Sequence, residues 1–256
     1  MTIHNATSRF SERANRYSLY RPGYPEAIIA FLEQAIGLKK TFHIADIGSG
    51  TGLFSRLLLE AGYGVNAVEP NEEMRKAAEE TLRVYHNFNS IAGTAEETTL
   101  AAHSIDLITV AQAFHWFRPE ETKREFERIL KSSGHVLLVW NILQSDTPFL
   151  KAYTELKEKY SEKLAHANRD NLERIKDFFY PAPVVVHQFR HAQPLNEVGL
   201  VGHLLSFSTV PLEGDAGHAE MMEELAMLFA QYADQGLVHL EYETRLYLVP
   251  FNKEVV

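Results

Sequence analysis

Short apolar runs alternate with amphipathic segments along the first 141 residues. Residues 26–36 carry apolar side chains at helical spacing, and Gly37 follows as a helix-ending residue. Later apolar runs predict strands at residues 42–47, 64–69, 89–92, 105–111 and 135–141, and helical periodicity falls between them at residues 54–61, 72–82 and 119–130. Strands that alternate with helices at this spacing require crossover connections, which predicts an α/β fold with a doubly wound, mostly parallel sheet.

The pattern changes after residue 141. Residues 149–164, 172–179 and 221–232 have the spacing of amphipathic helices, and residues 184–189 and 244–249 have the composition of strands. These two late strands could pair antiparallel at the edge of the sheet. We therefore expect one domain with a seven-stranded sheet, an antiparallel terminal strand pair and a helical insertion that acts as a lid.

Composition and charge exclude several classes of protein. The 256 residues are 45% hydrophobic and 23% charged, which is typical of a globular protein rather than a disordered chain or a fibre. The formal net charge of −9, from 25 Lys and Arg against 34 Asp and Glu, argues against broad binding to nucleic acid. The absence of cysteine excludes disulfides, thiolate metal sites and a cysteine nucleophile. The chain shows no signal peptide and no apolar run long enough to span a membrane, so we expect a cytoplasmic protein.

A glycine-rich loop follows the first predicted strand of the sheet. Gly48, Gly50 and Gly52 stand between this strand and its helix, where backbone N–H groups are free to meet a ligand. The dinucleotide fingerprint G-x-G-x-x-G places its third glycine where this chain has Leu53. The loop also follows a carboxylate, Asp46, which is unfavourable beside a pyrophosphate and suits the orientation of loop amides or an ammonium group.

Two further acids follow the next strands. Glu69 closes the second strand, 23 residues after Asp46, where a carboxylate can accept both hydroxyl groups of a ribose. Glu96 and Glu97 follow the third strand, where an adenine amino group could find an acceptor. The predicted ligand is a nucleoside with a cationic, amino-acid-like tail. A tight strand–helix turn without a ligand remains the alternative for the loop alone.

These motifs, Asp46–Gly52, Val68–Pro70 and Gly93–Glu96, resemble the class I S-adenosylmethionine-dependent methyltransferases. Phe10, Tyr20–Pro25 and Ala111–Phe117 are further similar to a small-molecule subgroup related to trans-aconitate methyltransferase. The resemblance implies a Rossmann-like fold and S-adenosyl-L-methionine as cofactor. It also implies a cofactor site lined by Gly48, Ser49, Gly50, Glu69, Pro70, Met74, Ala95, Glu96, Ala111 and Gln112. From their chemistry alone we add Asp46 and Arg21 to the predicted cofactor site.

The family resemblance also suggests how the domain is organised. Residues 1–40 would form an N-terminal lid and first helix, and residues 41–141 the cofactor-binding core. Residues 142–183 would form the helical insertion, and residues 184–256 would complete the sheet. One departure is the loop at residues 131–135, where the family usually carries a Pro-Gly-Gly turn and this chain reads Lys-Ser-Ser-Gly-His.

Several residues near the predicted site are candidates for acceptor chemistry. His115 could accept a proton, and Trp116 could offer an aromatic face to the acceptor or the sulfonium, although both could serve packing alone. Tyr17 and Tyr20 could contact the substrate from a lid, and Arg21 could meet a carboxylate. The alternative for this segment is a solvated helix start. No metal site is expected, because His187 and His191 lie four residues apart in a predicted strand.

The leading hypothesis is a methyltransferase that acts on a small molecule by in-line displacement, which requires alignment and exclusion of water. The alternatives are a cofactor-binding protein without catalysis, an RNA methyltransferase and a nicotinamide-dependent oxidoreductase. We expect no membrane partner and a monomer or homodimer. A nucleic-acid partner is expected only under the less favoured RNA methyltransferase alternative. The pattern does not name the acceptor.

Overall fold

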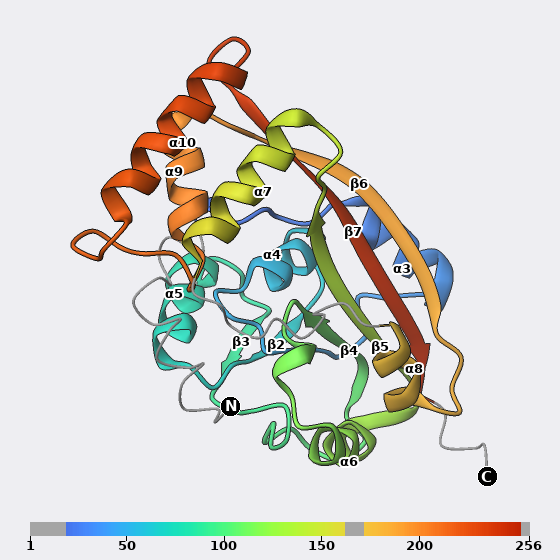
Figure 1. The fold of residues 1–256 in the computed structure, drawn as a ribbon. Helices are drawn as coiled ribbons and strands as arrows, with labels where there is room; N and C mark the ends of the chain where they lie inside the picture. Colours follow the sequence, from blue (N-terminus) through green and yellow to red (C-terminus); the bar gives the residue numbers. More distant parts are fainter. Residues whose placement is uncertain (1–18, 162–171, 252–256) are drawn as a thin grey trace.

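The computed structural model describes residues 19–161 and 172–251, which include a seven-stranded mixed sheet (Figure 1). The strand order is β3-β2-β1-β4-β5-β7-β6. β1 to β5 run parallel, and β7 pairs antiparallel with both β5 and β6. The strands span β1 Ile44–Ile47, β2 Val65–Val68, β3 Phe88–Ile91, β4 Ile105–Ala111, β5 Leu130–Leu143, β6 Val185–Leu195 and β7 Val238–Pro250. The sheet thus has the predicted mostly parallel order and antiparallel ending.

Helices cover both faces of the sheet. One face packs against α3 (Ala27–Ile36), α4 (Leu53–Glu60) and α5 (Glu72–Leu82), and the other against α6 (Pro119–Ile129) and α8 (Leu172–Phe179). Central strands supply both cores, because alternate side chains point to opposite faces. In β5, Leu137 belongs to the first core, which packs against α3, α4 and α5, and Leu138 belongs to the second core, which packs against α6 and α8. This is the physical reason that these strands are nearly continuous apolar runs.

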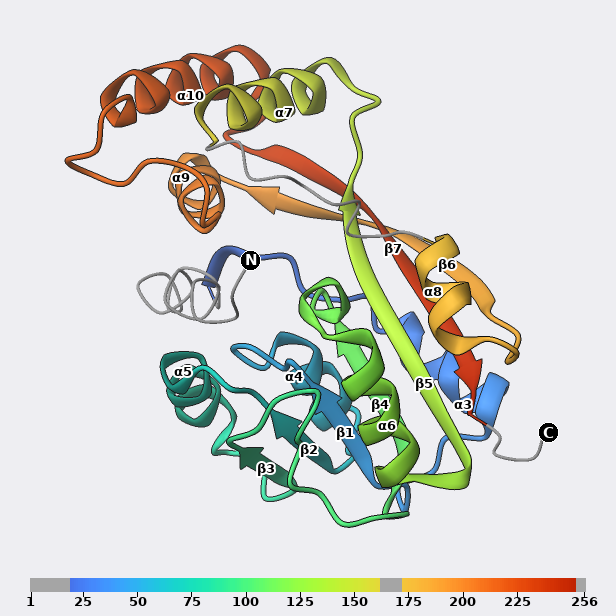
Figure 2. The same cartoon turned by 60° about the horizontal axis from the view of Figure 1, so that its bottom comes forward.

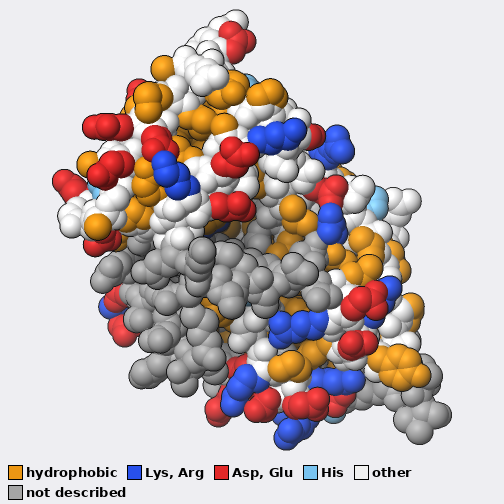
Figure 3. Space-filling model, in the orientation of Figure 1, with side chains coloured by type: hydrophobic (Ala, Val, Ile, Leu, Met, Phe, Trp, Pro, Cys, Tyr) orange, Lys and Arg blue, Asp and Glu red, His pale blue; other side chains and the backbone are white. Residues whose placement is uncertain are grey.

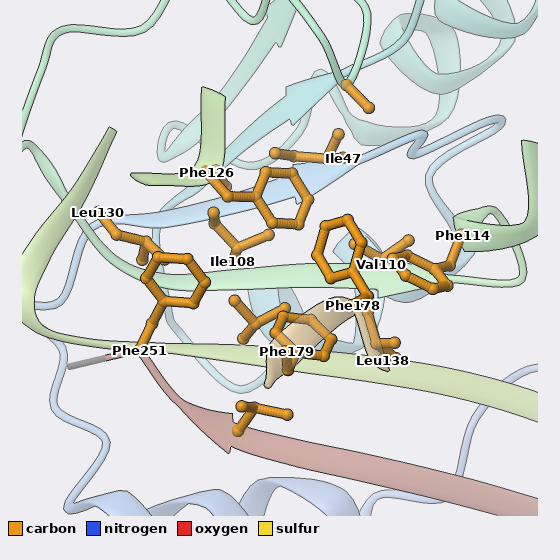
Figure 4. Packing of buried hydrophobic residues seen from close by; sticks show 14 of the residues in the cluster. Ile47, Ile108, Val110, Phe114, Phe126, Leu130, Leu138, Phe178, Phe179 and Phe251 are labelled. Carbon is orange, nitrogen blue, oxygen red and sulfur yellow. The ribbon is translucent and has the colours of Figure 1, made fainter. Parts of the chain in front are cut away.

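Aromatic side chains fill much of the second core (Figure 4). The Phe114 ring lies edge-on to Phe178 at a centroid distance of 5.0 Å, and Phe178 lies edge-on to Phe179 at 4.8 Å. Edge-to-face contacts of this kind add about 0.5–1.5 kcal/mol per pair to the burial of the rings. They attach α8 to the turn after β4, and this turn also borders the candidate site.

A third group of helices lies beyond the ends of the first strands (Figure 2). It consists of α7 (Pro148–Tyr160), α9 (Glu197–Leu205) and α10 (His218–Tyr232). Their buried faces share a core with the adjoining ends of β6 and β7, for example Leu195 and Leu240. These elements are therefore anchored on the two antiparallel strands.

The structure differs from the sequence predictions in this C-terminal part. α9 was not predicted, since its sequence, with Gly199 and Gly202, lacks a clear amphipathic repeat. Asn196 caps it by accepting a hydrogen bond from the Gly199 N–H at 2.8 Å. β6 and β7 are also longer than predicted. β6 is an edge strand with mostly exposed or half-buried side chains, so its polar half shows little hydrophobic signal.

Both signs of charge occur on the surface. Figure 3 shows acidic and basic side chains interspersed with apolar ones over α7 and α10 and again at the opposite end of this face. Within residues 19–161 and 172–251, each helix is too short or too polar to cross a lipid bilayer.

Candidate active site

The glycine loop connects β1 to α4 at the carboxyl edge of the sheet. Gly48, Gly50 and Gly52 adopt φ values of 69°, 57° and 80°, in the left-handed region that glycine enters without steric cost. The N–H groups of Gly48 and Ser49 both donate to the carbonyl oxygen of Val68, at 2.8 and 3.1 Å. The end of β2 therefore holds the first half of the loop in place.

Glu69 fixes the second half of the loop. Its Oε2 accepts a hydrogen bond from the Gly50 N–H at 2.9 Å, and its Oε1 accepts one from the Asn71 N–H at 2.9 Å. Burial raises the pKa of the Glu69 carboxyl group, and the two N–H groups and nearby Arg75 act in the opposite direction. Each oxygen accepts one protein N–H and retains acceptor capacity, so the carboxylate can also receive two ligand hydroxyl groups.

Asp46 has a different position from the one that the sequence suggested. Its carboxyl group is fully buried and accepts hydrogen bonds from Ser55 Oγ at 2.6 Å and Thr109 Oγ1 at 2.9 Å. It is not among the residues that line the pocket. Burial raises its pKa to about 6, against the effect of the two hydroxyl groups. Asp46 thus joins β1, β4 and α4 beneath the loop, and its contact with a ligand is not supported.

A pocket opens beside the glycine loop and collects most of the predicted cofactor residues. It is lined by Gly48, Ser49, Gly50, Glu69, Pro70, Met74, Ala95, Glu96, Ala111 and Gln112. These residues come from the ends of neighbouring strands and the loops that follow them, because the carboxyl ends of parallel strands meet at one edge of a sheet. Their roles toward a cofactor stay predictions, whereas their convergence on one pocket is a feature of the fold.

The pocket also contains residues that the sequence reasoning missed. Tyr24 and Phe54 lie edge-on at 5.0 Å, and Asn71 and Phe117 are further lining residues. Asn71 caps α5 by accepting a hydrogen bond from the Met74 N–H at 2.9 Å. An N-cap residue directly before an amphipathic helix is a readable signal, so Asn71 was detectable from the sequence. Tyr24 and Phe117 lie in motifs of the family resemblance but were not assigned to the site, and Phe54 carried no such signal.

Glu96 is held at the rim of the pocket. Its Oε1 accepts a hydrogen bond from the Arg118 N–H at 3.0 Å and lies 3.7 Å from Arg118 Nε. The Glu96 side chain is only 8% exposed, whereas that of Arg118 is 54% exposed. The contact therefore orients the acid and leaves Arg118 largely in solvent.

The two aromatic candidates after β4 lie in a short 3₁₀ turn, Phe114–Trp116. Trp116 is 39% exposed and lines the pocket. His115 packs beside Trp116 with ring centroids 4.8 Å apart, but it is not one of the lining residues. The structure thus brings Trp116 to the site and leaves His115 next to it.

The N-terminal candidates Tyr20 and Arg21 both lie outside the glycine-loop pocket. Tyr20 packs over Gly202 of α9, where an added Cβ would overlap its ring, and it lines neither pocket. Arg21 lines a second pocket, beside the first, rather than the glycine-loop pocket. Tyr17 lies outside the described residues. The predicted contact of Arg21 with the cofactor is therefore not supported by its position.

Comparison with known proteins bears on this site. Residues 45–138 match the methyltransferase domain family. An uncharacterised methyltransferase of Schizosaccharomyces pombe is 31% identical over 144 residues, which cover 56% of this chain and 56% of that protein. The chain thus spans about half the length of this curated relative. The methyltransferase match contains the glycine loop, Glu69 and Glu96.

Solved structures share the fold. A candidate type II methyltransferase from Anaeromyxobacter dehalogenans has a TM-score of 0.71 at 20% identity and covers 91% of this chain and 99% of its own. A candidate S-adenosyl-L-methionine-dependent methyltransferase from Methanococcus maripaludis has a TM-score of 0.51 at 16% identity, over 71% of this chain and 87% of its own. The fold is that of Rossmann-like methyltransferases, and the matched family segment lies on the strands and loops that form the first pocket.

Proposed function

We propose that this chain transfers a methyl group from S-adenosyl-L-methionine to a small-molecule acceptor by in-line displacement. The observation that carries the proposal is the junction of Glu69 and Gly50. It places a buried carboxylate and the turn of a glycine loop in one pocket, inside the segment that matches the methyltransferase domain.

The residues of the pocket fit the chemistry of this cofactor. Glu69 would accept the ribose hydroxyl groups, and Pro70 and Met74 would flank the adenine ring. Ala95 and Glu96 would lie at its amino group, and the loop from Gly48 to Gly50 would border the methionine part, with Ala111 and Gln112 at the sulfonium end. When bound, S-adenosyl-L-methionine supplies an activated methyl group, so the protein's tasks are to align the acceptor and keep water away.

The geometry of the glycine loop argues against the binding of a nicotinamide dinucleotide. In dinucleotide sites, the backbone N–H groups of such a loop receive the pyrophosphate. Here the N–H groups of Gly48 and Ser49 donate to Val68 and that of Gly50 donates to Glu69. A buried carboxylate at this point would also repel a diphosphate. The oxidoreductase alternative is therefore the weaker one.

His115 stays our candidate general base, and Trp116 stays a candidate for acceptor contact. Because His115 lies beside the pocket rather than in its lining, a small movement of the 3₁₀ turn would be needed for direct proton transfer. A His115→Gln variant tests this role. Loss of turnover with unchanged cofactor affinity supports it, and unchanged turnover from pH 6 to 9 rejects it.

The proposal is tested by two measurements on the purified chain. Calorimetric titration with S-adenosylhomocysteine, and separately with NADH, shows which cofactor binds. Incubation with methyl-labelled cofactor and a metabolite extract then shows whether a small molecule becomes labelled. Binding without any labelled product would indicate a cofactor-binding protein without catalysis, and label confined to RNA or protein would overturn the small-molecule acceptor.

The finer classification also belongs to this proposal. A relationship to the trans-aconitate subgroup, a cytoplasmic location and a monomeric or homodimeric state all stay predictions. The net charge of −9 and the interspersed charges on the face in Figure 3 agree with the proposed small acceptor better than with RNA, which favours a basic surface.

A further inference from the structure

A second pocket adjoins the first on the side of the third helical group. Gln112 lines both pockets. It follows β4 with a φ of 60°, and its Nε2 donates to the carbonyl oxygen of Asn141 at 3.2 Å. The described lining of the second pocket consists of Arg21, Gln112, Trp140, Asn141, Ile142, Leu143, Lys157, His203, Phe207, Tyr242 and Arg245. A molecule in this pocket would lie next to the predicted sulfonium end of the first.

The described charged side chains that line this second pocket are all basic. Three cationic side chains border the pocket from three segments far apart in the sequence: Arg21 before α3, Lys157 on α7 and Arg245 on β7. No carboxylate is among the described lining residues. Gathering basic side chains around one pocket costs repulsion between like charges, which the ion pair with Glu243 offsets for Arg245.

Two of the cationic side chains, Arg21 and Lys157, form cation–π contacts with the Phe207 ring. The guanidinium carbon of Arg21 lies 3.8 Å from the centroid of the Phe207 ring, and Lys157 Nζ lies 5.0 Å from the same centroid. The third cation, Arg245, is oriented by Glu243, whose Oε1 accepts from Arg245 Nε at 3.0 Å. Stacking and pairing of this kind hold the side chains in place before a ligand arrives.

A buried histidine forms part of the wall. His203 is 1% exposed, with Tyr153 Oη 2.7 Å from its Nδ1 and Tyr242 Oη 2.9 Å from its Nε2. Burial, and then the charges of Arg21 and Lys157, hold the pKa of His203 well below its usual value. His203 is therefore neutral near pH 7 and leaves the pocket's charge to the three longer side chains.

Trp140 forms an aromatic part of the wall. It is 2% exposed, and its ring lies edge-on to Tyr247 with the ring centroids 5.6 Å apart.

We propose that the second pocket is the acceptor site and that Lys157, Arg245 and Arg21 bind an anionic group, carboxylate or phosphate, of the methyl acceptor. The proposal rests on the methyltransferase function above and deepens it by naming the acceptor's chemical class. The forked guanidinium groups suit the paired oxygens of such an anion, and the aromatic wall suits the rest of a small molecule.

The test uses the full chain and a metabolite extract separated on an anion exchanger. With methyl-labelled cofactor, we expect label transfer from the retained fraction and none from the flow-through. Phosphatase treatment of the retained fraction distinguishes the two anions: lost acceptor activity indicates a phosphate, and surviving activity a carboxylate. The retained fraction should also raise the melting temperature in the presence of S-adenosylhomocysteine, which measures binding without turnover.

A matched pair of variants locates the anion. Lys157→Gln should raise the apparent KM for the retained fraction about tenfold, with little change in kcat, because a charge-assisted contact is lost in the bound state. Lys151→Gln, on an exposed part of the same helix, removes the same charge and should leave both values unchanged. The affinity for S-adenosylhomocysteine should be the same in both variants.

The outcomes separate this proposal from the methyltransferase function. Acceptor activity in the flow-through, or equal KM values for the two variants, overturns the anionic acceptor while methyl transfer stands. A tenfold weaker S-adenosylhomocysteine affinity in Lys157→Gln assigns the cations to the cofactor's carboxylate and likewise overturns it. If S-adenosylhomocysteine does not bind the unaltered chain, the proposed function fails, and the acceptor site fails with it.

Discussion

The carboxylate of Glu69, at the end of β2, accepts a hydrogen bond of 2.9 Å from the backbone N–H of Gly50, in the loop after β1. The contact connects two motifs that stand 19 residues apart in the sequence. It gives the glycine loop its shape and places the carboxylate in the pocket wall. A single side chain thus serves both the architecture of the site and its proposed affinity for a ribose.

Glu69→Gln should therefore lower both the stability of the fold and the affinity for the cofactor product. An amide retains one acceptor oxygen, but its NH₂ group would face either the Gly50 or the Asn71 N–H, so one buried donor loses its partner. We expect a loss of about 1–3 kcal/mol in unfolding free energy and at least a tenfold weaker affinity for S-adenosylhomocysteine. Chemical denaturation and calorimetry measure these effects. Glu79→Gln, at an exposed position of α5, is the control, and an equal change in both variants would refute the role of Glu69.

Alanine substitution at two glycines of the loop separates steric overlap from backbone strain. Both Gly48 and Gly50 have positive φ, but a Cβ at Gly48 would lie 2.6 Å from Cβ of Ala113, whereas a Cβ at Gly50 meets nothing within 4 Å. Gly48→Ala should cost more stability than Gly50→Ala, by about 1–3 kcal/mol for the overpacking. Thermal unfolding of the two variants side by side provides the measurement, and equal losses would contradict the packing difference.

Asp46 should make stability depend on pH in an unusual direction. Its pKa in the fold is about 6, above the ordinary 3.8, so the folded state binds more protons than the unfolded state between these values. The contribution of this carboxyl group to the unfolding free energy is greatest below pH 4, where it is protonated in both states, and is lost as the pH rises through 6. Relative to the unaltered chain, Asp46→Asn should gain up to about 3 kcal/mol between pH 4 and pH 8. Denaturant titrations at both pH values test this, and a difference that is constant with pH would contradict it.

Trp116 should report cofactor binding by fluorescence. The chain has two tryptophans, of which Trp140 is buried and Trp116 is 39% exposed in the lining of the first pocket. Titration with S-adenosylhomocysteine should therefore change the emission through Trp116. Trp116→Phe should remove most of the response while Trp140 still emits. A response of undiminished size in this variant would place the ligand elsewhere.

The edge of the sheet that carries the first pocket could be predicted from the sequence to a large extent. Apolar runs separated by helical repeats indicated β1 to β5, and the glycine loop, Glu69 and Glu96 followed successive strands. Parallel strands have their carboxyl ends on the same side, so motifs after those strands must meet at one edge. The predicted residues that line the first pocket follow from this rule.

The same reasoning failed where a position depends on distant contacts. Asp46 lies one residue before the end of β1 and Glu69 directly follows β2, and the sequence gives no sign that the first side chain turns under the loop and the second into the pocket. The difference arises because Thr109, 63 positions from Asp46, lies opposite it in the neighbouring strand and donates to its carboxylate. Arg21 was likewise placed in the predicted cofactor site, yet it packs on Phe207 in the second pocket.

The sequence by itself determined the alternating α/β order, the parallel sheet and the loop-and-carboxylate edge, because periodicity and crossover geometry act locally and leave few topologies. Only the tertiary structure decided the length of β6 and β7, the position of α9 and the gathering of Arg21, Lys157 and Arg245 around one pocket. Those features depend on side chains that meet across long stretches of chain, and no local pattern records which of them will meet.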